Sequence, residues 1–178
     1  PTFMIHKSRS ASGIWWVYHK NLGNDGYMSL ESTGSNQTGS TNVWRNTAPT
    51  SSVFKVGLDS IASSNETMVA YCFAPIQGYS KFGSYTGNGD ADGTFVYTGF
   101  KPAWIMVKRS SDTQSYSLWD NKRDGYNQTD KSLTPNETGA EETRSIDFLS
   151  NGFKQRQNNT ATNADGDTYI YMAFAEQP

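Results

Sequence analysis

The sequence predicts an all-β protein, an antiparallel β-sandwich of the jelly-roll or lectin-like kind built from two pseudo-repeats. Three observations favour this class. Aromatic residues make up 13% of the 178 residues, and 16 residues are glycines, a composition typical of strands joined by tight turns. Short apolar segments are separated by turn residues, and no segment shows a helical period with capping residues. The same series of segments also occurs twice.

The two copies are related by an offset of 101 residues. PTFMIHKSRS from Pro1 resembles PAWIMVKRSS from Pro102, and VAYCFA from Val69 resembles IYMAFA from Ile170. An internal repeat decides the architecture, because each copy then forms an equivalent unit. We therefore expect one domain over residues 1–178, with repeats at Pro1–Ala74 and Pro102–Ala175 and a connector hairpin at Pro75–Lys101.

Each repeat is expected to contain the same order of strands. In the second repeat these are WIMVKR, YSLWD, SIDFLSNGFKQR and DTYIYMAFA, and the connector adds KFGSY and TFVYTGF. Asn151-Gly152 suits a type I′ turn, so SIDFLSNGFKQR is predicted to be a hairpin. In the first repeat SSVFK, which ends at Lys55, matches the second strand of this hairpin. In the second repeat NETGAEETRS, which begins at Asn136, has room for one helical turn.

Two matched strands, Val69–Ala74 and Ile170–Ala175, are apolar or small on both faces. This pattern is typical of strands at the centre of a covered sheet. In the opening strand GIWWVYHK, Trp15 has a large aromatic counterpart and is expected to face the core, whereas Trp16 is matched by Ser117. Because side chains alternate across a strand, Trp16 is expected to point outward.

Charge and cysteine content argue against several classes of function. The net charge is −2 and 18% of residues are charged, so the clustered basic face that nucleic-acid binding needs is not expected. No apolar run reaches the length of a membrane span. Cys72 is the single cysteine, which rules out an internal disulfide, and we expect a buried, inert thiol. We predict no nucleic-acid partner and no membrane insertion.

Catalytic patterns are weak, and we predict that the protein is not an enzyme. The two histidines, His6 and His19, have no histidine counterparts in the second repeat. Ser52 and Lys55 have the S-x-x-K spacing, but that motif needs a helical turn to bring the side chains together. Glycan cleavage needs two carboxyl groups about 5 to 10 Å apart. The sequence offers candidates without pairing them: Asp120, Asp124, Glu141, Glu142 and Asp147.

Two Asp-Gly turns raise the question of calcium. NGDADG contains Asp90 and Asp92, and NADGD contains Asp165 and Asp167. Alternating oxygen ligands in a glycine-bent loop are typical of calcium sites. Neither loop has the distant bidentate Glu, and Asp-Gly is also ordinary turn chemistry. We expect structural turns and no cofactor, with calcium as the alternative.

Aromatic side chains near polar turns are the candidate ligand-binding or interface residues. An aromatic ring offers an apolar face to the C–H side of a sugar, and the same rings are enriched at subunit interfaces. Packing over loops is the alternative for each of them. The residues are Trp16, Tyr18, Trp44, Tyr79, Tyr85, Trp119 and Tyr126.

The stretch AYCFAPIQGYSKFGSYTGNGDADGTFVYTGFKPAWIMVKRS, with IDFLSNGFK and YIYMAFAE, resembles a repeat domain of tail and tail-fibre proteins from tailed, often marine, bacteriophages. The resemblance covers nearly the whole chain and implies a virion component rather than a chemistry. It implies other virion subunits as partners, a homo-oligomer such as a trimer, a host-surface glycan as ligand, and a place on the phage particle.

On this resemblance we expect a structural or adhesion domain of a virion appendage. A polysaccharide depolymerase and a capsid or sheath decoration protein are the alternatives. The hairpin that precedes Pro102 has no counterpart before Pro1. We therefore expect a segment of a longer protein, in which one sheet edge is left open unless a neighbour supplies the missing hairpin.

Overall fold

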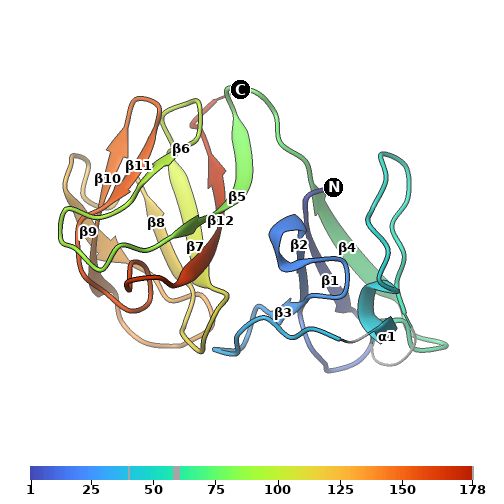
Figure 1. The fold of residues 1–178 in the computed structure, drawn as a ribbon. Helices are drawn as coiled ribbons and strands as arrows, with labels where there is room; N and C mark the ends of the chain where they lie inside the picture. The colour runs from blue at the N-terminus through green and yellow to red at the C-terminus, as the bar shows by residue number, and fades with distance from the viewer. Residues whose placement is uncertain (40, 58–60, 178) are drawn as a thin grey trace.

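The fold consists of three four-stranded antiparallel sheets (Figure 1). This computed structural model describes residues 1–39, 41–57 and 61–177. The predicted all-β sandwich is confirmed. The elements are β1 (Phe3–Ser8), β2 (Trp16–His19), η1 (Lys20–Leu22), β3 (Met28–Ser29), α1 (Thr41–Trp44), β4 (Met68–Phe73), β5 (Ser80–Thr86), β6 (Phe95–Tyr97), β7 (Trp104–Arg109), β8 (Ser117–Asp120), β9 (Thr129–Ser132), β10 (Glu142–Leu149), β11 (Gly152–Gln155) and β12 (Thr168–Phe174).

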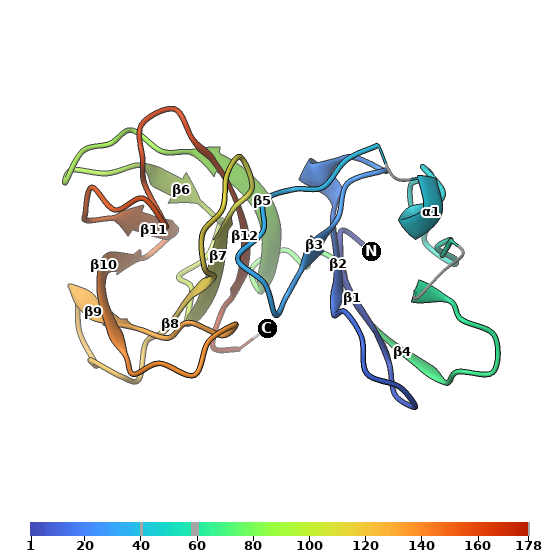
Figure 2. The same cartoon turned by 90° about the horizontal axis from the view of Figure 1, so that it is seen from below.

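The sheets stack in three layers, one more than a simple sandwich. The N-terminal sheet has the order β3-β2-β1-β4, the central sheet β5-β12-β7-β8, and the outer sheet β6-β11-β10-β9. Trp119 and Phe153 belong to the apolar core between the central and outer sheets. Val17, Met106 and Ile170 belong to the core between the central and N-terminal sheets. Figure 2 shows the N-terminal sheet on one side of the central sheet and the outer sheet on the other.

The strand register repeats with the 101-residue offset of the sequence. Phe3 lies opposite Phe73 in the β1–β4 pair, and Trp104 lies opposite Phe174 in the β7–β12 pair. Phe3 also lies opposite His19 in β2, as Trp104 lies opposite Asp120 in β8. Three strands of each repeat therefore follow equivalent paths.

The two repeats meet face to face about an approximate two-fold axis. Phe73 and Phe174, which are equivalent positions, contact each other with ring centroids 6.0 Å apart. The Phe3–Phe73 contact at 6.0 Å has its counterpart in Trp104–Phe174 at 5.8 Å. A contact between equivalent residues is what a two-fold arrangement produces. Both halves thus contribute to one shared interior.

The repeats differ in what covers their far faces. In the second repeat the β10–β11 hairpin belongs to the outer sheet. In the first repeat α1 and irregular chain take its place, and a third core joins Met4 and Tyr18 to Val43, Trp44 and Ile61. The predicted hairpin strand at SSVFK is wrong, because residues 51–55 are irregular. The predicted helical turn in NETGAEETRS is also wrong, because that stretch leads into β10.

The predicted β10–β11 hairpin is confirmed, with its turn one residue earlier than expected. Leu149 pairs with Gly152, so Ser150 and Asn151 form the turn. A Cβ atom on Gly152 would lie 2.2 Å from the main-chain oxygen of Val96. This glycine is therefore required by the close approach of β6.

The prediction that both matched apolar strands are central holds for β12 and is wrong for β4. Residues 169–173 of β12 are all buried between the other two sheets. β4 is the edge strand of the N-terminal sheet, Tyr71 is 49% exposed, and Cys72 is exposed rather than buried. The sequences match, but β5 pairs with β12 and none of the described residues pairs with the corresponding side of β4.

The expected orientation of the tryptophan pair is reversed. Trp16 is only 8% exposed and packs in the third core, 5.0 Å from the ring of Tyr27. Trp15 is 36% exposed, with the Nζ atom of Lys7 5.9 Å from its ring. The reason is the chain around α1, which covers the face that carries Trp16 and has no counterpart in the second repeat.

Candidate functional site

The two histidines are buried and are not placed for acid–base chemistry. Burial lowers the pKa of His19 to about 4, and the nearby Tyr171 main chain has a smaller effect in the opposite direction. The Asn21 N–H donates to His19 Nδ1 at 3.1 Å. Burial also lowers the pKa of His6. Within the described part of the chain, no three His, Cys, Asp or Glu side chains are grouped to hold a metal ion.

Each carboxylate considered for glycan cleavage forms an ion pair. Hydrogen bonds from the main-chain N–H groups of Lys131 and Asp130 lower the pKa of Asp124, whereas a general acid needs a raised pKa. These contacts give the depolymerase alternative no support. The pairs are Asp120–Arg123 at 2.9 Å, Asp124–Lys131 at 3.7 Å, Glu142–Arg144 at 2.7 Å, Asp147–Arg156 at 3.4 Å, and Glu141–Arg123.

The two Asp-Gly loops lie side by side and are joined by a buried asparagine. Asn163 Nδ2 donates to Asn88 Oδ1 at 2.9 Å and to the main-chain oxygen of Asp90 at 2.8 Å. The Gly89 N–H donates to the main-chain oxygen of Asn163 at 2.9 Å. The contact between the two loops was not predicted, because neither loop sequence contains a signal that they lie together.

Two of the four carboxylates in these loops pair with basic side chains, and Asp90 Oδ1 accepts the Asp92 N–H at 2.8 Å. Asp92 pairs with Lys154 at 2.6 Å and Arg156 at 3.1 Å, and the hydrogen bond from Lys154 lowers the pKa of Asp92. Asp167 pairs with Arg109 at 2.6 Å, and Asp165 is exposed. This arrangement favours the structural turns over the calcium alternative, because two carboxylates are already neutralised.

Five of the seven aromatic residues predicted to bind a ligand or a subunit are buried inside their own domain, so those predictions are wrong. Trp16, Tyr18 and Trp44 lie in the third core, where residues in and around α1 cover them. Tyr85 and Trp119 lie in the core between the central and outer sheets. Polar residues beside them in the sequence gave no sign of this burial, because loops from elsewhere cover the rings.

The remaining two aromatic candidates differ. Tyr79 is half-buried, with its ring centroid 5.7 Å from that of Phe174. Tyr126 is 80% exposed, which leaves it available for contact. The two residues belong to separate places on the fold, so they do not form one site.

A groove of about 360 Å³ beside Tyr97, here named the connector groove, combines an exposed aromatic ring with polar lining residues. Its floor and walls come from the turn after β4, the start of β5 and the end of β6. Tyr97 is 58% exposed and Ile76 55% exposed, so both aromatic and aliphatic surface is open to solvent. The lining residues are Pro75, Ile76, Gln77, Gly78, Ser80, Lys81, Tyr97, Thr98 and Gly99.

A tight turn shapes one wall of the connector groove. The Ile76 N–H donates to the Ser80 main-chain oxygen at 3.1 Å, and the Ser80 hydroxyl donates to the Ala74 main-chain oxygen at 3.1 Å. Gly78 has a φ of 78°, a conformation that glycine adopts without strain. Nothing lies within 4 Å of where its Cβ would be. A side chain at this position would therefore project into open space at the groove, and glycine leaves that space free.

Lys81 holds the aromatic wall in place. Its Nζ atom donates to the main-chain oxygen of Tyr97 at 2.8 Å and lies 4.9 Å from the centroid of the Tyr97 ring. A cation at this distance over an aromatic face is attracted to it. The contact favours this position of the ring, and a ring already in place reduces the entropy that binding would cost.

Sequence reasoning missed Tyr97, although the alternation of TFVYTGF contains the signal. Val96 is buried between the central and outer sheets, so its neighbours Phe95 and Tyr97 face outward and are 44% and 58% exposed. Period-two alternation in this strand therefore places Tyr97 on the exposed face.

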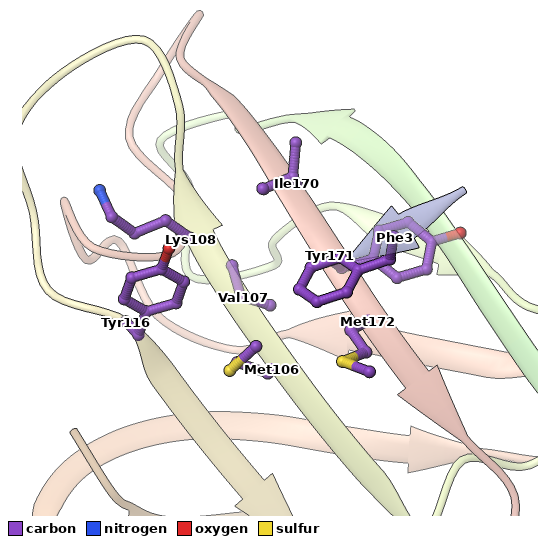
Figure 3. Close-up of a pocket in the computed structure, with 8 residues that line it drawn as sticks. All are labelled: Phe3, Met106, Val107, Lys108, Tyr116, Ile170, Tyr171 and Met172. Atoms are coloured by element: carbon purple, nitrogen blue, oxygen red, sulfur yellow. The ribbon is translucent and has the colours of Figure 1, made fainter. Parts of the chain in front are cut away.

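Two other hollows are less suited to a polar ligand. Figure 3 shows a small cavity where Phe3 approaches Ile170 and Met172 from the N-terminal sheet. Its volume of about 10 Å³ is about that of one water site. A larger open groove of about 410 Å³ between the N-terminal and central sheets is lined by apolar residues alone, among them Ile5 and Trp104.

These features define an internally duplicated β-sandwich domain with an open surface groove. The chain belongs to the family described as Domain of unknown function (DUF7483), whose model matches residues 1–178. No curated protein and no solved structure matches the chain. In the described residues, no helix has the length and apolar character to cross a membrane.

Proposed function

We propose that this domain is a non-catalytic binding module of a bacteriophage virion appendage, and that its connector groove binds a sugar of the host surface. The observation that carries the proposal is the exposed ring of Tyr97, held by Lys81 in a groove of about 360 Å³. An aromatic face beside hydrogen-bonding groups is the combination that a sugar ring requires, since it has both C–H and hydroxyl surfaces.

The groove supplies both kinds of contact. The Tyr97 ring offers the apolar face, and the Gln77 amide and Lys81 ammonium offer hydrogen bonds to hydroxyl groups. The volume lies at the small end of the range of ligand sites, about 300 to 1,000 Å³, which suits one or two sugar units. Such a shallow site binds weakly, and several copies on one particle raise the overall affinity.

The place of the domain on a virion rests on the resemblance of its sequence to tail-fibre repeats. Other virion subunits and further copies of the same chain are the partners that this role requires. The capsid or sheath decoration alternative shares the fold and needs no ligand, so ligand binding separates the two.

Binding to a glycan array and to purified host-surface polysaccharide tests the proposal. Tyr97→Ala should weaken binding about tenfold or more, which corresponds to 1.4 kcal/mol. Tyr71→Ala is the matched control, because Tyr71 is an exposed tyrosine outside the connector groove, and it should leave binding unchanged.

Two results would overturn the proposal. Binding that Tyr97→Ala leaves intact would move the site elsewhere, and silence on every glycan by a folded protein would favour the decoration alternative. Release of new reducing ends from the polysaccharide would show cleavage and favour a depolymerase.

A further inference from the structure

The outer edge of β4 carries main-chain groups that have no strand partner among the described residues. On the inner side of β4, the Arg9 N–H donates to the Thr67 main-chain oxygen at 2.7 Å. Because the hydrogen-bonding groups of a strand alternate between its two sides, those of Met68, Ala70 and Cys72 point to the open side. An exposed edge of this kind is a template for another strand.

The second repeat shows which structure occupies the equivalent edge. β12, the counterpart of β4, pairs with β5 from Phe174 opposite Ser80 to Thr168 opposite Thr86. The β1–β4 and β7–β12 pairs share one register, so the edge of β4 presents its groups in the same order as the edge of β12.

The apolar groove of about 410 Å³ marks the place of one side chain of such a strand. Phe82 of β5 lies 5.9 Å from Phe3, 6.1 Å from Phe73 and 5.8 Å from Phe174, measured between ring centroids. The approximate two-fold axis relates these partners to Trp104, Phe174 and Phe73. All three of the related residues line the groove, which is therefore the counterpart of the site that Phe82 fills.

Exposure along β4 fits the same account. Tyr71 is 49% exposed, whereas its counterpart Met172 is 4% exposed. Ala70 is exposed, and its counterpart Tyr171 is 4% exposed. A strand over this edge would cover apolar surface on both faces of β4, and burial of such surface is stabilising.

We propose that the edge of β4 binds an antiparallel strand with the pattern of β5, supplied by a further unit of this family that lies N-terminal to Phe3. The added strand would precede Phe3 in the chain, just as β5 precedes Trp104 in the second repeat. The strand adds to the N-terminal sheet, and the aromatic residue in the Phe82 position fills the apolar groove. This inference is independent of ligand binding in the connector groove.

The test extends the chain of residues 1–178 with a second copy of Pro75–Lys101 placed directly before Pro1. In this extended chain the added strand precedes Phe3 by the spacing that separates β5 from Trp104. Amide hydrogen exchange at Met68, Ala70 and Cys72 should slow by about tenfold or more. Modification of the exposed Cys72 thiol by a maleimide should slow by a similar factor.

The matched control carries serine in the Phe82 position of the added segment and leaves the native Phe82 unchanged. It should lose most of the protection, while exchange in β12 stays as in the parent chain and shows that the domain is folded. Unchanged exchange at β4 in the extended chain would overturn the inference. So would a dimer of the parent chain, seen by sedimentation, that protects the same amides, because the occupant would then be a second copy.

Discussion

The Nζ atom of Lys108 lies 2.8 Å from the main-chain oxygen of Gly34, so a side chain of the second repeat is anchored in the first. The same ammonium donates to the main-chain oxygens of Thr33 at 3.2 Å and Arg109 at 2.9 Å. Burial of the side chain, with a smaller effect of the charge on Arg109, lowers the pKa of Lys108 to about 8. The ammonium is therefore still mostly charged at pH 7, where it ties the two halves together.

Lys108→Met should destabilise the protein by about 2 to 3 kcal/mol, because three carbonyl groups lose their shared donor while apolar volume is kept. Urea unfolding at pH 7 measures the free energy of unfolding. Lys131→Met is the control, since Lys131 is an exposed lysine, and it should change that free energy by less than about 0.5 kcal/mol. Equal effects of the two substitutions would contradict the anchoring role.

The adjacent tryptophans make an internal comparison of exposure. Trp16→Ala should destabilise by about 3 to 5 kcal/mol, because it leaves a cavity in the third core. Trp15→Ala removes a ring that is 36% exposed and should cost about 1 kcal/mol or less. Thermal and urea unfolding of the two variants distinguish them, and the reverse order of stability would show that Trp15 is the core residue.

The fold class was predictable because period-two alternation and turn residues are local signals. The offset of 101 residues also predicted the equivalent strands, since Phe3 and Trp104 have partners at the same register. What the repeats do not share was not predictable. Trp16 is buried by the chain around α1, which the second repeat lacks. Cys72 is exposed because no strand among the described residues covers the edge of β4, whereas β5 covers the equivalent edge of β12.

The candidate site was harder to predict than the fold. Tyr97 and Lys81 are 16 residues apart in the sequence, and their contact depends on how the central and outer sheets stack. Predicted aromatic residues such as Trp44 and Trp119 lie beside polar residues in the sequence, yet distant segments cover them. Ring exposure is decided by tertiary packing, which composition does not report.

Asn163 should matter more for stability than the carboxylates it lies beside. Asn163→Ala leaves the Asn88 N–H and the main-chain oxygens of Asp90 and Gln157 without their side-chain partner and should cost about 3 kcal/mol. Asp92→Asn weakens two largely exposed ion pairs and should change the stability much less, because water already screens such pairs. Calcium should leave the melting temperature of the parent protein unchanged, and a rise that Asp92→Asn abolishes would support the calcium alternative.

His19 should make the protein less stable as the pH falls below neutrality. Its pKa is about 4 in the folded protein against 6.5 unfolded, so the unfolded state binds a proton first. The stabilisation is complete above pH 6.5 and is lost between that pH and pH 4, by about 3 kcal/mol in total. Asn is the matched replacement, since its side-chain oxygen can accept the Asn21 N–H that now donates to Nδ1.

Urea unfolding of the parent and of His19→Asn between pH 4 and pH 7.5 measures this effect. The difference in unfolding free energy between the two proteins should shrink as the pH falls, because only the parent has the imidazole at position 19. The NMR signal of the His19 ring should show no titration above pH 5. A ring that titrates near pH 6.5 in the folded protein would contradict the assignment, because His19 would then be as solvated as in the unfolded chain.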